Sequence, residues 1–223
     1  TGWFTRDAAT FARVSEVMLA EAVPADPPKR LIVAVDGFAF AEPDTREALR
    51  PLVERLAALI GDTREEVMAP QGLSVWGRAQ RTLQTAEAWR TFKPWLERDN
   101  PALAFNVARG LINGSQVPEV DRQWAALMRR EARGRLEYLL PPGSILCLPT
   151  TPFPAPIKAL PLDQQNPVRE RILCLCAHGG LAGLPQLNLP GATVDGLPVG
   201  LSILAGRGAD MALVATALAL EGG

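Results

Sequence analysis

The residues of this sequence that could act as acids, bases, nucleophiles or metal ligands are few and scattered. The only histidine, His178, belongs to no His-Glu-x-x-His zinc pattern and has no Gly-x-Ser-x-Gly nucleophile elbow to work with. The three cysteines are Cys147, Cys174 and Cys176, and the last two point in different directions on a predicted helix. We therefore expect a structural role for His178, buried structural thiols at all three cysteines, and no metal site.

The serines also lack a sequence neighbour that could activate them. The five serines are Ser15, Ser74, Ser115, Ser144 and Ser202. None forms a Ser-x-x-Lys pair, and none lies in a Gly-Ser-rich run. A serine hydroxyl without an adjacent base is a weak nucleophile at neutral pH. The residues alone therefore predict no catalytic nucleophile in this chain.

One short glycine motif, Gly206-Arg207-Gly208, precedes the last predicted helix. Glycine next to a helix N-terminus can hold an anion. This motif, however, lacks the Lys-Ser/Thr ending of a phosphate-binding loop. We expect a connecting loop here, and we expect no cofactor.

The composition is typical of a globular protein with a substantial core. Of 223 residues, 48% are hydrophobic and 21% are charged, and 23 basic against 24 acidic residues give a net charge of −1. Such a balance excludes the basic footprint of a nucleic-acid binder. No apolar stretch is long enough for a membrane span, and no signal peptide is recognisable. The odd number of cysteines favours a reducing compartment, so we expect a cytoplasmic protein.

Short apolar runs alternate with amphipathic segments, which predicts an α/β fold with a mixed β-sheet flanked by helices. Strands are predicted at Leu31–Val35, Glu66–Met68, Ser144–Leu148, Leu184–Pro190 and Val199–Leu204. The turn dipeptide Asp195-Gly196 should join the last two strands.

Helices are predicted where apolar residues recur every three or four positions. They cover Asp7 to about Leu19, with Asp7 as N-cap, then Pro43–Ile60, Ser74–Phe92, Ala102–Ile112, Pro118–Leu140, Pro167–Ala177 and Ala209–Leu220. Pro94 should end the third helix. The aromatic residues of this region, Trp76, Trp89, Phe92 and Trp95, could line an apolar cavity, although core packing is the favoured role for each.

Four segments resemble the C-terminal half of the amidase-signature family. They are Thr1–Asp7, Leu146–Pro156, Leu181–Pro190 and Asp195–Leu204. Their order matches the family, and the two Gly-Leu-Pro motifs that flank short apolar strands are the most specific part of the likeness. The resemblance implies that residues 1–223 form the C-terminal part of a single amidase-signature domain.

The family's Gly-Gly-Ser-Ser-Gly-Gly-Ser core and its upstream catalytic lysine are absent from this sequence. Gly180 also stands where many relatives carry asparagine. In the family, a lysine activates a serine through a second serine, and the resulting acyl-enzyme is hydrolysed by water. The resemblance therefore places the catalytic Lys-Ser-Ser outside this chain, in an N-terminal catalytic part, so that no residue of this chain is expected to be catalytic.

The function implied by the resemblance is hydrolysis of a carboxylic amide to an acid and ammonia or an amine. The expected partners are a small amide substrate, the N-terminal half of the domain on the same or a separate chain, and a second copy in a possible homodimer. A non-catalytic, amidase-derived subunit or binding module is the alternative, and an unrelated α/β enzyme is a weaker one. The first residue is Thr1 rather than methionine, which favours a fragment.

Substrate-binding residues are expected in the loop after the strand Ser144–Leu148. Pro149 ends that strand, and Thr150, Thr151 and Pro152 follow. Polar groups at strand ends are where α/β folds place their sites. In the family, the segment Arg46–Val117 is variable, and we expect it to shape the pocket.

Overall fold

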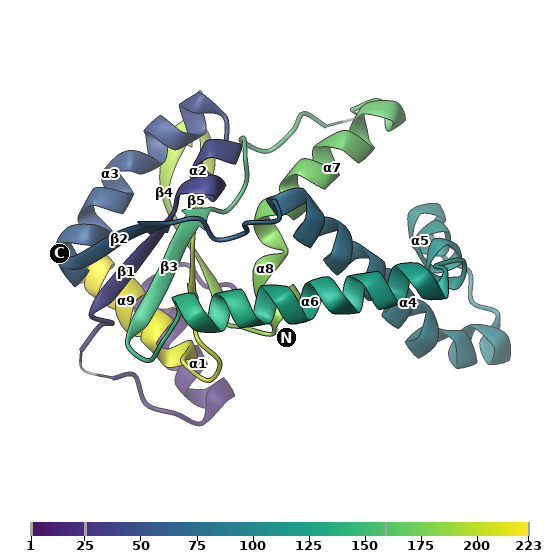
Figure 1. Ribbon diagram of the computed structural model, residues 1–223, viewed down its shortest axis with the longest axis horizontal. Coiled ribbons are helices and arrows are strands. Elements are labelled where there is room, and N and C mark those ends of the chain that lie inside the picture. Colours follow the sequence, from purple (N-terminus) through teal and green to yellow (C-terminus); the bar gives the residue numbers. More distant parts are fainter. Residues whose placement is uncertain (1, 25, 159, 223) are drawn as a thin grey trace.

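The computed structural model of the chain describes residues 2–24, 26–158 and 160–222. Its centre is a five-stranded sheet in the order β2-β1-β3-β5-β4 (Figure 1). The strands are β1 (Arg30–Ala34), β2 (Asp62–Glu66), β3 (Ser144–Pro149), β4 (Gln186–Val194) and β5 (Leu197–Ala205). β1 is parallel to β2 and β3, whereas β5 is antiparallel to β3 and β4, which confirms the mixed sheet. Thr1, the first residue of the resembling segments, lies outside the described residues.

Helices cover both faces of this sheet. They are α1 (Ala8–Leu19), α2 (Val35–Phe40), α3 (Pro43–Ile60), α4 (Leu73–Asp99), α5 (Phe105–Ser115), α6 (Glu119–Leu139), α7 (Leu162–Cys176), α8 (His178–Ala182) and α9 (Asp210–Gly222). α3 and α9 pack on one face, and α4, α6 and α8 contribute to the core on the other (Figure 1). Within the described residues, no helix is both long and apolar enough to cross a membrane.

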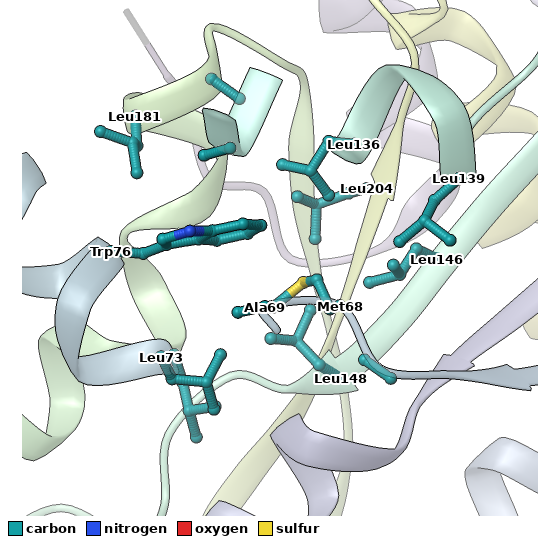
Figure 2. Close-up of a cluster of buried hydrophobic side chains, with 14 of the residues drawn as sticks. Met68, Ala69, Leu73, Trp76, Leu136, Leu139, Leu146, Leu148, Leu181 and Leu204 are labelled. Atoms are coloured by element: carbon teal, nitrogen blue, oxygen red, sulfur yellow. The ribbon is translucent and has the colours of Figure 1, made fainter. Parts of the chain in front are cut away.

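The central strand β3 separates two hydrophobic cores. All six of its residues are buried, as expected for a strand covered on both faces. Leu146 and Leu148 face the first core, which also contains Met68, Leu136 and Trp76 (Figure 2). Ile145 and Cys147 face the second core, which α3 and α9 close. The continuous apolar run in the sequence therefore correctly predicts this strand.

α4 is longer than the sequence predicts. The expected end near Phe92 is wrong, because the helix continues through Pro94 to Asp99. It ends at Asn100, which has a left-handed backbone (φ 40°). Pro94 removes one helical hydrogen bond, but this last part of α4 is exposed, so water can satisfy the freed carbonyl group.

The second strand is also displaced from its predicted position. β2 covers Asp62–Glu66, not Glu66–Met68, so that prediction is wrong. A strand of charged residues at the edge of a sheet carries no apolar pattern that the sequence could reveal. Met68 instead lies fully buried in the first core, and its backbone N–H donates to the Asp36 carboxylate at 2.9 Å.

The aromatic residues of α4 have different environments. Trp76 is fully buried, which confirms core packing for that residue, and Trp89 is half-buried. Phe92 and Trp95 are 48% and 37% exposed, so the expectation of core packing is wrong for both. The far part of α4 extends away from the sheet together with α5 and α6 (Figure 1), and no sheet core is available to these two side chains.

Candidate functional site

Thr150 directly follows β3, and its hydroxyl, backbone N–H and carbonyl groups all form hydrogen bonds with other segments of the chain. Its hydroxyl donates to Asn188 Oδ1 at 2.6 Å and lies 3.0 Å from Ser202 Oγ. Its backbone N–H donates to the carbonyl of Gly200 at 2.8 Å. Its own carbonyl accepts from the Cys176 thiol at 3.1 Å. The position at which the sequence predicts a polar site is therefore one where β3, β4, β5 and α7 meet.

The hairpin of β4 and β5 supplies the other members of this cluster. Gln186 Nε2 donates to Ser202 Oγ at 3.0 Å, and Gln186 Oε1 accepts from the backbone N–H of Gly179 at 3.1 Å. Thr150, Gln186, Asn188 and Ser202 thus form one hydrogen-bonded chain, which we call the polar strip. The Asp195-Gly196 turn closes the hairpin with both residues at positive φ, as predicted.

The polar strip interrupts an otherwise apolar face of the sheet. Asn188 pairs with Ser202, and Ser202 pairs with Leu148, so these three side chains share one face. Gln186 pairs with Leu204 on the same face. Leucine occupies this face over β3 and forms part of the first core there. Toward β4 the face becomes polar, although apolar side chains would pack as well and would need no hydrogen bonds.

Two glycines make room for the amide groups of the strip. A Cβ at Gly200 would overlap Asn188 Oδ1, so a larger residue there would displace the Asn188 amide. A Cβ at Gly179 would lie 2.9 Å from Gln186 Oε1, closer than real Cβ contacts allow. Glycine at both positions therefore allows the two amide groups to keep the positions that they have in the strip.

Thr151 and Pro152 do not join the strip. The Thr151 hydroxyl donates to the carbonyl of Phe153 at 2.8 Å, within its own loop. Pro152 is buried, and its carbonyl accepts from the backbone N–H of Glu42 at 2.8 Å. Of the three sequence-predicted site residues, the structure thus brings only Thr150 together with other polar side chains, while the other two shape the loop.

Gln186, Asn188 and Ser202 are not among the site residues predicted from the sequence. A signal is present, because Gln186 and Asn188 alternate with leucines between the two Gly-Leu-Pro motifs. Alternation of this kind shows that one face of a strand is polar. It does not show that this face continues the hydrophobic core of the neighbouring strand.

His178, the first residue of α8, is fully buried against the Trp76 ring, with ring centroids 5.7 Å apart. Neither imidazole nitrogen has a hydrogen-bond partner among the described residues. Burial lowers the pKa of His178 to about 4, although the Asp36 carboxylate and the Cys174 backbone, which is close but outside good hydrogen-bond geometry, act in the opposite direction. His178 is therefore neutral at physiological pH and lies in the core, which is the structural role expected from the sequence.

The cysteines provide no activated nucleophile. Burial raises the pKa of the Cys147 thiol to about 12. Desolvation also raises the pKa values of Cys174 and Cys176. Cys176 is exposed, so the expectation of a buried thiol is wrong there, whereas it is confirmed for the other two. No group of three His, Cys, Asp or Glu side chains in the described part of the chain could hold a metal ion.

A cleft of about 520 Å³ lies beside the polar strip. The N-terminal segment with Trp3, the connection from α8 to β4, and the start of α9 line it. Gln186 belongs to both the cleft and the strip. The expected connecting loop at Gly206-Arg207-Gly208 is confirmed, and Arg207 and Gly208 also line this cleft.

No family model matches the chain. Among curated proteins, Amidase 1 of Oryza sativa subsp. japonica is 27% identical over 94% of this chain and 54% of its own length. Amidase 1 of Arabidopsis thaliana is 24% identical over 94% of this chain and 56% of its own length. One component of the Glutamyl-tRNA(Gln) amidotransferase of Thermus thermophilus is 37% identical, but over only 44% of this chain and 20% of its own length.

The solved structures lead to the same class of protein. A crystal structure of an amidase matches 98% of this chain and 51% of its own chain, with a TM-score of 0.79 and 27% sequence identity. The structure of 6-aminohexanoate cyclic dimer hydrolase, at 18% identity and a TM-score of 0.69, shares the fold. The architecture is thus part of the amidase fold. The chain is a homologue of the amidase-signature enzymes, and it spans about half the length of the curated amidases that it matches.

Proposed function

We propose that this chain is the C-terminal half of an amidase that hydrolyses a carboxylic amide to an acid and ammonia or an amine. The reaction would proceed through a seryl acyl-enzyme, with the catalytic Lys-Ser-Ser in a segment outside this chain. The observation that carries the proposal is the match to amidases over nearly all of this chain but only about half of theirs. A cytoplasmic location is part of the proposal.

The hydrogen bonds of the serines support the proposal that the catalytic residues lie outside this chain. The Ser15 hydroxyl donates to the carbonyl of Phe11, and the Ser115 hydroxyl to that of Ile112. Ser202 is occupied within the polar strip. Among the described residues, no serine hydroxyl forms a hydrogen bond with a lysine, a histidine or a carboxylate. An acyl-transfer nucleophile needs such a base within hydrogen-bond reach.

The open edge of the sheet supports a neighbouring segment. β4 pairs with β5 on one side only, and no second strand of the described residues adds to its other side. An unpaired edge presents free backbone N–H and C=O groups that favour the addition of another strand. We propose that the N-terminal half adds to this edge, which would place its Gly-Ser-rich core near the polar strip and the cleft.

In this arrangement the loop after β3 contributes to substrate binding. Thr150 would contribute to substrate binding indirectly, by holding the other side chains of the polar strip in position. Thr151 and Pro152 would hold the shape of the loop. The exposed thiol of Cys176 lies at the same place, bonded to the carbonyl of Thr150.

The test compares residues 1–223 alone with the same residues joined to a segment that carries the Gly-Ser-rich core and its lysine. Ammonia release from a panel of simple amides is measured for both proteins. We expect turnover only in the joined protein, and we expect it to disappear when the core serine is replaced by alanine. Turnover by a soluble monomer of residues 1–223, abolished by replacing one of its own five serines, would refute the proposal.

The alternative, a non-catalytic subunit or binding module, also has an observation in its favour. One curated relative, 22% identical over 96% of this chain, is named Translocon at the outer membrane of chloroplasts 64, from Pisum sativum. That name denotes a translocon component rather than a hydrolase. If the joined protein were soluble and folded but released no ammonia from any amide, this alternative would replace the enzymatic proposal.

A further inference from the structure

As the side chains lie in the structure, the hydrogen bonds of the polar strip all run in one direction. At one end, the backbone N–H of Gly179 can only donate, so the atom of Gln186 that it meets must be the oxygen Oε1. The Gln186 nitrogen Nε2 therefore faces Ser202 and donates to its hydroxyl oxygen. Because a backbone N–H sets the order, it does not depend on how the Gln186 amide is assigned.

The remaining two bonds continue in the same direction. Thr150 has one hydroxyl proton, and Asn188 Oδ1 accepts it at 2.6 Å. The 3.0 Å contact between the two hydroxyls must then be donated by Ser202 to Thr150. Every donor and acceptor that faces into the strip is thereby used. With Oδ1 placed toward the Thr150 hydroxyl, the Asn188 nitrogen Nδ2 points away from Thr150.

The outward nitrogen of Asn188 is free to bind a ligand. Asn188 is exposed, and its Nδ2 forms no hydrogen bond with the described residues. Gly200 lets the amide lie directly over the backbone of β5. The side chain is thus held at its oxygen end while its two N–H groups face solvent. Binding a ligand through a donor that already has a fixed orientation loses less side-chain conformational entropy than binding through a freely rotating one.

We propose, on the basis of the proposed amidase function, that Asn188 Nδ2 binds a second carbonyl oxygen of the substrate, one that is not part of the amide bond being cleaved. The cleaved carbonyl is excluded because the resemblance assigns its stabilisation to the Gly-Ser-rich loop. We propose a neutral oxygen rather than a carboxylate, because the polar strip consists of uncharged side chains only. The preferred substrates are therefore amides with a second neutral carbonyl group. Thr150 and Ser202 act as positioning residues for Asn188.

Three matched amides distinguish this role. Pentanediamide carries a second neutral carbonyl, pentanamide lacks it, and 5-amino-5-oxopentanoate carries a carboxylate in its place. The joined protein should prefer pentanediamide over the other two. In Asn188→Ala, the ratio of kcat/KM for pentanediamide to kcat/KM for pentanamide should fall about 2- to 10-fold, the value of one neutral hydrogen bond. The loss should appear mainly in KM, because the contact is made in the ground state as well.

Two further variants separate positioning from packing. Thr150→Val keeps the shape of the side chain but leaves Asn188 Oδ1 without its donor, and it should lower selectively the preference for pentanediamide. Thr193→Val is the matched control, because Thr193 is exposed on the same strand, β4, and belongs to no hydrogen bond of the strip. Asn188→Asp should abolish the preference for pentanediamide, since a carboxylate oxygen would face the substrate oxygen.

A second readout does not depend on turnover. The side-chain NH2 signals of Asn188, assigned by their loss in Asn188→Asp, are followed by NMR in the joined protein as either amide is added. A shift with pentanediamide but not with pentanamide supports the inference, even if no ammonia is released and the proposed function fails. Equal losses of activity for both amides in Asn188→Ala, or Asn188 signals that respond to neither amide, would overturn the inference while leaving the amidase proposal intact.

Discussion

Replacement of His178 by leucine should change how the stability of the protein depends on pH. The wild-type imidazole is fully buried, and its two nitrogens lack partners among the described residues. Burial lowers the pKa of His178 from 6.5 to about 4. Leucine is of similar size and has no group that titrates. The substitution therefore removes the titration while keeping the contact with Trp76.

The sign and size of the effect follow from this pKa. As pH falls below 6.5, the His178 imidazole becomes protonated in the unfolded state. In the folded state it stays neutral until the pH reaches about 4. The free energy of unfolding of the wild type therefore decreases across this window. The difference between the two pKa values corresponds to about 3 kcal/mol, at about 1.4 kcal/mol for each unit. Above this window, His178→Leu should already be more stable by about 1 kcal/mol, because buried imidazole nitrogens without well-formed hydrogen bonds leave the core.

The assay is urea unfolding of wild type and variant at several pH values between 4 and 6.5, followed by tryptophan fluorescence. Carboxylates also titrate in this range, but they do so in both proteins and cancel in the difference. His178 is the only histidine, so its imidazole signals in NMR give its pKa directly once any affinity tag has been removed. Parallel stability curves for the two proteins, or a measured pKa near 6.5, would refute the reasoning.

Two pairs of substitutions test the packing of α4. Gly110→Ala and Gly114→Ala change the same helix, α5, but only the second puts a Cβ into a backbone carbonyl of α4. Thermal unfolding should show a gain of up to about 1 kcal/mol for Gly110→Ala and a loss of about 1–3 kcal/mol for Gly114→Ala, and equal effects would contradict the packing. Trp76→Phe removes the 2.8 Å hydrogen bond from the buried Trp76 indole to Glu131 and should lower the free energy of unfolding in urea by about 1–3 kcal/mol. Trp95 is partly exposed, so Trp95→Phe should be near neutral. A reversed order of the two effects would refute this assignment.

The parts of the fold that the sequence predicts are those governed by local rules. The run Ser144–Leu148 is apolar on both sides and is ended by Pro149, so both β3 and the position of Thr150 follow from it. Asp7 satisfies the first turn of α1 by accepting from Thr10, as an N-cap should. The hairpin turn at Asp195-Gly196 is equally local. Each of these features depends on residues adjacent in the sequence.

The rest of the candidate site depends on pairing between distant segments. Thr150 and Ser202 meet across 52 residues, and Thr150 and Asn188 across 38. Their contact depends on the register of β4 on β5 and of β5 on β3, which no local pattern fixes. For the same reason, nothing in the sequence reveals that Gly200 leaves space for the Asn188 amide. The sequence shows these polar residues, but it does not show which of them form hydrogen bonds with one another.

The two edges of the sheet differ in how well they are protected against the addition of another strand. β2 protects its edge with charges, since all but one of its residues, Asp62–Glu66, are acidic or basic, and Arg30 pairs with Asp62 at 2.9 Å. β4, in contrast, has no charged residue from Gln186 to Val194, although Pro190 and a bulge near Gly191 interrupt part of its edge. Charges at a sheet edge oppose further pairing, whereas a neutral edge permits it. Of the two edge strands, β4 is therefore the one to which we propose that the N-terminal half adds, and this edge lies beside the polar strip.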